Sequence, residues 1–184
     1  MENKYVKNLV YAVIEKSEAD NWEDAVLEWD FFDCEEDDTA SSYCVCGKEN
    51  IRYLHTIQNR YNGNLLFSIG SSCIKKFGRR ELDSEVKLQE DLFRLLHHIE
   101  NHHFIVLTSN FFTRKLIDYL YEVGAFDNDY NHYDGYDDYC FFKKMFNKRN
   151  KDEITGLQQR KINAIIINSI YPFLENTIAH KTKA

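Results

Sequence analysis

Apolar residues recur at helical spacing in several stretches of the chain, and these stretches predict a mainly helical protein. The run between Tyr5 and Ile14 predicts a helix over residues 3–17. Asp20 can cap a second, short helix that ends near Trp29. Further helices are predicted over residues 84–99, from Ser109 to Gly124, over residues 137–148, and from Thr155 to just before Pro172.

A β-hairpin is predicted in the first half of the chain. Residues 51–57 and 65–69 suit strands, and Asn62-Gly63 between them is a strong hairpin signal. Residues 30–42 are crowded with acidic side chains and predict a strand end or a loop, while the short apolar run 104–107 predicts a strand or extended segment. The predicted fold class is α+β, with a zinc-stapled hairpin set on a mainly α-helical body. The expected organisation is one compact unit made of residues 1–42, the hairpin module 43–80 and the helical body 81–184.

Cysteine and histidine at the hairpin suggest a metal site. Cys44 and Cys46 are separated by one residue, and Gly47 follows directly. His55 lies in the first predicted strand, and Cys73 follows the second strand. A hairpin returns the chain to its starting point, so these four side chains can meet around one Zn²⁺ in a closed, structural tetrahedron. Cys34 is the alternative to His55 as fourth ligand, and burial without metal is the alternative to zinc. Cys140 stands among aromatic residues and is predicted to lie in the core.

The same segment resembles a small zinc-binding module of uncharacterised phage and mobile-element proteins. In that module Cys-x-Cys-Gly is followed by a ligand-bearing strand, a turn and Gly-Ser-x-Cys, and the strand ligand falls on His55 here. The resemblance covers residues 20–80 and implies structural zinc without enzyme activity. It rests on Trp22, Ala25, Glu28, Trp29, Cys44-x-Cys46-Gly47, Ile51, Ile57-x-Asn59, Asn62-Gly63 and Gly70-Ser71-x-Cys73-Ile74-x-x-Phe77.

Composition and charge narrow the function classes. The 184 residues include 23 Lys plus Arg against 30 Asp plus Glu, a formal charge of −7, which argues against general nucleic-acid binding. Five cysteines, an odd number, and a start without a signal-peptide pattern predict a cytoplasmic protein of a bacterial host without disulfides and without membrane association. The HExxH, Walker and Gly-x-Ser-x-Gly motifs are absent, so the chain is predicted not to be an enzyme.

An acidic, tyrosine-rich stretch is the candidate partner surface, and a solvated loop is the alternative. Tyrosines supply rigid contact area, and carboxylates beside them would pair with a basic partner. In size, charge and metal module the chain also resembles zinc-containing phage inhibitors of type II CRISPR nucleases. The resemblance implies an anti-CRISPR protein that blocks guide RNA or target DNA engagement. The alternative is a zinc-dependent nucleic-acid-binding accessory protein, favoured by basic groups at residues 75–80 and 143–151. The predicted partner-binding residues are Asp127, Asp129, Tyr130, Tyr133, Asp134, Tyr136, Asp137 and Asp138.

Overall fold

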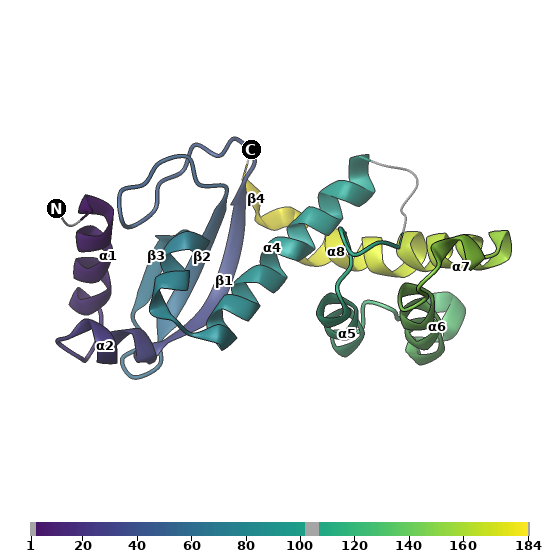
Figure 1. The fold of residues 1–184 in the computed structure, drawn as a ribbon, viewed down its shortest axis with the longest axis horizontal. Coiled ribbons are helices and arrows are strands. Elements are labelled where there is room, and N and C mark those ends of the chain that lie inside the picture. The colour runs from purple at the N-terminus through teal and green to yellow at the C-terminus, as the bar shows by residue number, and fades with distance from the viewer. Residues whose placement is uncertain (1–2, 102–106, 184) are drawn as a thin grey trace. The chain divides into compact units, whose positions relative to one another are not determined.

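The computed structural model describes residues 3–101 and 107–183 and has the predicted α+β fold (Figure 1). The chain forms two compact units, one made of residues up to Glu90 together with those from Lys181 onward, the other of Asp91–His180. The predicted boundaries at residues 42 and 80 differ from this division. The reason is helix α4 (Arg80–Asn101), whose first turns bring Leu82 and Val86 into the core of the first unit.

Two predicted helices open the first unit. Helix α1 (Lys4–Glu15) is capped by the Asn3 side chain and buries Leu9 and Val13 on one face. Helix α2 (Trp22–Ala25) begins at an Asn21 cap and continues as the 3₁₀ turn η1 (Val26–Glu28). Both helices are confirmed within a few residues of the predicted bounds, because capping side chains and apolar periodicity mark them locally.

A four-stranded sheet lies at the centre of the first unit. It consists of β1 (Trp29–Asp37), β2 (Tyr53–Asn59), β3 (Leu65–Ile69) and β4 (Thr182–Lys183), in the order β3-β2-β1-β4 (Figure 1). β2 pairs antiparallel with β1 and with β3, and the predicted hairpin turns at Gly63, whose φ is 73°. β4 adds a short parallel strand to β1 and is an element that the sequence pattern did not predict.

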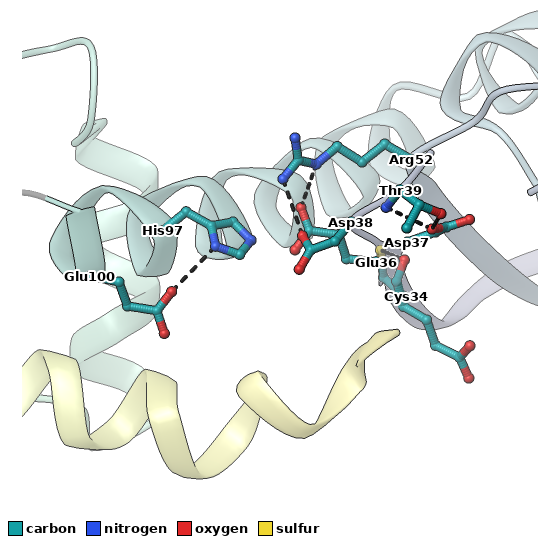
Figure 2. A network of polar contacts seen from close by, with 9 residues as sticks. Cys34, Glu36, Asp37, Asp38, Thr39, Arg52, His97 and Glu100 are labelled. Atoms are coloured by element: carbon teal, nitrogen blue, oxygen red, sulfur yellow. Dashed lines mark hydrogen bonds and ion pairs between the residues drawn. The ribbon is translucent and has the colours of Figure 1, made fainter. Parts of the chain in front are cut away.

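The acidic segment after Trp29 is a strand and not a loop, which corrects the sequence interpretation. Strand β1 has nine residues and occupies an interior position of the sheet. Four of its five carboxylates each meet a cation from elsewhere in the chain, the fifth, Asp37, accepts hydroxyl and backbone hydrogen bonds, and Figure 2 shows Arg52 against Glu36. These pairs are Asp30 with Arg60 and Arg79, Asp33 with Lys181, Glu35 with Lys183 and Glu36 with Arg52.

The core of the first unit joins the sheet to the helices around it. Trp29, Ile57 and Ile69 are fully buried and belong to one apolar cluster with Leu9 and Val13 of α1. After β3 the chain turns through helix α3 (Ser71–Ile74) and the 3₁₀ turn η2 (Lys75–Phe77) into α4. The same cluster includes the three cysteines of the predicted metal site, Cys44, Cys46 and Cys73.

The second unit is helical around a core of aromatic side chains. Phe142 packs edge-to-face on Phe112 and Phe126, with ring centroids 5.2 Å and 5.6 Å apart. Thr113, and not the predicted Ser109, caps helix α5, and Gly124 follows its end with a φ of 77°. The elements are α5 (Arg114–Glu122), η3 (Asp129–Asn131), α6 (Tyr136–Phe146), η4 (Lys151–Glu153), α7 (Gly156–Ile165), the π-helical segment η5 (Ile166–Ile170) and α8 (Tyr171–Thr177), before η6 (Ala179–Lys181).

Two sequence predictions fail in this unit, and one lies outside the described residues. The last helix was expected to end before Pro172, but it continues as α8, because the preceding π-helical turn admits a residue without an N–H group. Cys140 is exposed and not part of the core. Most of the apolar run at 104–107 falls outside the described residues. Within the described part of the chain, every helix is too short or too polar to cross a bilayer.

Candidate metal centre

A tight turn brings the first two cysteines together. Gly47 adopts a φ of 87°, in the left-handed region that glycine tolerates best. Its N–H donates to the Cys44 carbonyl at 2.7 Å, and the Cys44 N–H donates to the Lys48 carbonyl at 2.8 Å. Cys44 and Cys46 are therefore held with both sulfur atoms on the inner side of the turn, where both side chains are buried.

Contacts with distant elements fix this turn in place. The Val45 N–H donates to the Ser68 carbonyl of β3 at 2.8 Å. The Asn8 side chain of α1 donates to the Cys46 carbonyl at 2.9 Å. The turn is thus attached both to the edge strand and to the first helix, so its cysteines keep a fixed position relative to the core.

Cys73 completes a group of three ligands. It lies in α3, just after the turn at Gly70, and its N–H donates to the Gly70 carbonyl at 2.8 Å. Its sulfur lies 3.7 Å from the sulfur of Cys44. The sulfur atoms of Cys44, Cys46 and Cys73 all lie within 4.8 Å of one another, and all three residues are buried. Three of the four predicted ligands therefore meet.

The environment of the group favours one thiolate, at Cys44. The pKa of Cys44 is lowered to about 5, first because the Cys73 thiol donates a hydrogen bond to its sulfur. The backbone N–H groups of Cys46 and Gly70 add to this effect, and burial opposes it. The same hydrogen bond raises the pKa of Cys73, and burial raises the pKa of Cys46. A divalent cation would stabilise all three sulfurs as thiolates, so the donor set fits a soft metal ion.

His55 does not join this group, contrary to the sequence prediction. Its ring is fully buried, its Nε2 lies 3.2 Å from Oε1 of Glu90 on α4, and its ring meets Phe31 edge-on at 6.4 Å. The register of the sheet explains this, because His55 pairs with Cys34 of β1 and Ile69 of β3 and projects toward α4. Cys34, the alternative ligand, is also elsewhere: its thiol contacts the Glu35 carbonyl at 3.7 Å, and burial raises its pKa.

The site offers three protein ligands instead of four, and this changes what a bound metal ion could do. Among the described residues, the group around Cys44 holds three ligands and not four. The expectation of a non-catalytic site depended on a shell filled by four protein ligands, and this geometry does not supply the fourth. The sequence interpretation did not include the N–H groups of Lys48 and Gly70, which point at sulfur. Their positions directly beside the turn glycine and before Ser71 were the available signal.

The predicted partner-binding residues lie together in the second unit, in the segment after α5 and in the first turn of α6. Tyr130, Tyr133 and Tyr136 are 84%, 69% and 55% exposed, so three aromatic rings face solvent within seven residues of chain. Gly135 permits this compact loop, because a Cβ there would lie 2.6 Å from Phe126. We refer to these three tyrosines and to Asp127, Asp129, Asp134, Asp137 and Asp138 as the acidic tyrosine loop.

Part of the charge of this loop is already engaged. Asp138 pairs with Lys161 of α7 at 3.0 Å, and Asp129 accepts a hydrogen bond from the Tyr133 hydroxyl. Asp127 accepts the Gly135 N–H at 2.9 Å. The sequence has no Lys or Arg between Lys115 and Lys143, but Lys161 brings a positive charge to this surface from α7.

The basic groups that favoured nucleic-acid binding are partly used inside the fold. Arg79 bonds to the Trp29 carbonyl and to Asp30, and Lys143 binds Asp118 at 2.6 Å. Lys151 donates to the Met145 carbonyl at 3.0 Å. The exposed Lys75 and Lys76 remain at the surface of the first unit.

Comparisons with protein-family models, with curated proteins and with solved structures give no match for this chain. The resemblance to a phage zinc module therefore stays a hypothesis, and function has to be inferred from the residues and their geometry.

Proposed function

We propose that this chain is a zinc-binding protein whose metal ion is held by Cys44, Cys46 and Cys73. The observation that carries the proposal is the convergence of three buried sulfurs within 4.8 Å. Thiolates are soft ligands, and zinc accepts them in a tetrahedral arrangement that a Cys-x-Cys turn and a third cysteine can provide. The ion would connect the turn before β2 to α3 after β3, and so staple both ends of the hairpin.

The metal assignment can be tested on the full chain. Elemental analysis of protein purified under reducing conditions should find one zinc per chain. Cys44→Ser and Cys73→Ser should lose it, because each removes a ligand. Cys140→Ser is the matched control, since Cys140 is exposed and lies in the other unit. Metal-free wild-type protein, or equal zinc in all three variants, would contradict the assignment.

We propose further that the protein acts without catalysis, by binding a basic, nucleic-acid-handling protein through the acidic tyrosine loop. Support comes from three tyrosines that expose more than half of their surface among carboxylates. Aromatic side chains are enriched at protein interfaces, and surrounding charges steer the encounter with a basic partner. The sequence resemblance suggests a type II CRISPR effector nuclease, which such a surface would keep from guide RNA or target DNA.

Binding kinetics with a type II CRISPR nuclease test this mechanism. Tyr130→Ala and Tyr133→Ala should raise the dissociation rate, because they remove contact area. Asp134→Asn and Asp137→Asn should slow association instead, and most at low salt.

The controls use the same chemistry outside the loop. Tyr61→Ala removes a tyrosine that is 69% exposed in the first unit, and it should bind like wild type. Lys144→Glu reverses an exposed charge on α6. If the loop variants bind as the parent does while Lys144→Glu loses binding, the interface includes the basic group at residues 143–151, and the proposed surface is wrong.

A further inference from the structure

A pocket of about 200 Å³ adjoins the three-cysteine group on one side. Its walls come from the segment between the metal-binding turn and β2, and from the turn that leads into α3. Cys44 and Cys73 both line it, whereas Cys46 does not. The small residual exposure of the cysteines agrees with this placement, at 5% and 6% for Cys44 and Cys73 against 1% for Cys46. The Cys44–Cys73 edge of the group is therefore the side that faces the pocket.

The pocket provides no obvious fourth ligand of its own. Apart from the two cysteines, the described residues of its walls include no His, Cys, Asp or Glu. His55 and Cys34 are engaged at Glu90 and at the Glu35 carbonyl. A tetrahedral ion held by three sulfurs would thus direct its remaining position toward the accessible side. The other lining residues are Lys48, Asn50, Ile51, Arg52, Tyr53, Gly70, Ser71 and Ser72.

We propose that the fourth position of the metal is filled from this pocket by an exchangeable small ligand, water at rest and a low-molecular-weight thiolate when one is present. The proposal rests on the proposed metal binding. In the exchange, the thiol gives its proton to solvent, its sulfur forms the bond to the metal, and the bound water leaves. No oxidant or reductant is needed.

Size, softness and charge all favour such a ligand. A water molecule occupies about 30 Å³ of liquid, so a pocket of about 200 Å³ admits a ligand of several heavy atoms. A metal that already carries three thiolates accepts a further soft donor. Lys48 and Arg52 line the pocket and offset part of the added negative charge, although Arg52 is also paired with Glu36 at 2.7 Å. The N–H groups of Cys46, Lys48 and Gly70 disperse charge from the sulfurs.

The experiment uses the full chain loaded with Co²⁺, whose visible spectrum reports the ligands of a tetrahedral site. A phosphine keeps the cysteines reduced, so that the buffer contributes no thiol. Titration with 2-mercaptoethanol should shift the d–d bands and increase the sulfur-to-metal charge-transfer band, saturating at one thiol per metal without metal loss.

Two variants locate the entry route. Ser72→Trp should keep the metal and lose the response to thiol, because the indole fills the pocket. Lys48→Ala should weaken the apparent thiol affinity by about two- to fivefold, as expected for one exposed charge. Lys76→Ala is the matched control, since it removes an exposed lysine that does not line the pocket, and it should titrate like wild type.

The outcomes separate this inference from the metal assignment. Protein that binds no Co²⁺ or Zn²⁺ would overturn both. Protein that binds one metal ion but shows a spectrum indifferent to thiol would overturn the exchangeable ligand alone. A response that Ser72→Trp leaves unchanged would show that the ligand enters elsewhere, and would overturn the pocket as its site.

Discussion

Asp37 organises the chain after β1 through an unusual number of hydrogen bonds. Its two carboxylate oxygens accept from the backbone and hydroxyl groups of Thr39, Ser41 and Ser42, and Figure 2 shows the approach of Thr39. These donors favour the ionised form and hold the pKa of Asp37 well below its usual range, led by the Ser42 hydroxyl. The ionised Asp37 carboxylate therefore fixes the start of the loop that leads to Cys44.

Asp37→Asn should destabilise the first unit at neutral pH, because an amide accepts fewer hydrogen bonds than a carboxylate. A carboxyl group with a lowered folded pKa stabilises the protein above the ordinary aspartate pKa, about 3.9, and this stability is lost as pH falls further. The deficit of the variant in urea unfolding should thus be constant near neutrality and shrink below about pH 4. Asp20→Asn, at an exposed site, is the control. A deficit independent of pH in acid would contradict this account.

Substitution of His55 should lower the stability of the fold without removing the metal ion. Its ring is fully buried against Phe31 and Glu90, so His55→Ala should lower the free energy of unfolding by about 2–4 kcal/mol, as other large-to-small core substitutions do. The variant should nevertheless keep one zinc per chain. Urea unfolding and elemental analysis of the same preparation check both parts. Loss of zinc from folded protein would restore His55 as the fourth ligand.

At the scale of elements, the metal-binding turn and α3 are expected to loosen together when the ion is removed. The N–H groups of Cys46, Lys48 and Gly70 donate to sulfur, and this hydrogen bonding strengthens when the sulfur is a metal-bound thiolate. Structural zinc contributes on the order of 10 kcal/mol in small domains.

Hydrogen exchange with and without chelator measures this effect. Amides in residues 44–48 and 70–74 should exchange faster by about tenfold or more after zinc removal, because local opening becomes easier. Helix α7 in the second unit is the internal control and should keep its protection. Equal acceleration in both units would mean that the ion stabilises the whole chain and not the hairpin locally.

Elements with local signals could be predicted from the sequence, and those that depend on distant partners could not. The Gly47 turn, the Asn62-Gly63 hairpin and the Thr155 cap of α7 are encoded within a few residues, so the Cys44–Cys46 pair followed directly. Strand β1 was misread because its acidic residues meet cations far away in sequence, with Lys181 lying 148 positions from Asp33. His55 was misassigned for the same reason, since its direction depends on the sheet register and on Glu90.

For the whole molecule, the net charge bears on the choice between protein and nucleic acid as partner. With a formal charge of −7 and basic groups partly paired internally, the chain should not bind duplex DNA or single-stranded RNA at physiological salt. Fluorescence anisotropy with labelled oligonucleotides measures this. Micromolar binding that falls steeply with added salt would favour the nucleic-acid-binding alternative over the acidic tyrosine loop.

The pairing of β4 with β1 has a consequence for the order in which a ribosome delivers this protein. Asp33 and Glu35 are each translated 148 residues before the lysines that neutralise them, Lys181 and Lys183. The first unit therefore holds an unfinished sheet edge throughout synthesis of residues 91–180. During that interval the nascent chain exposes an acidic, unpaired strand edge.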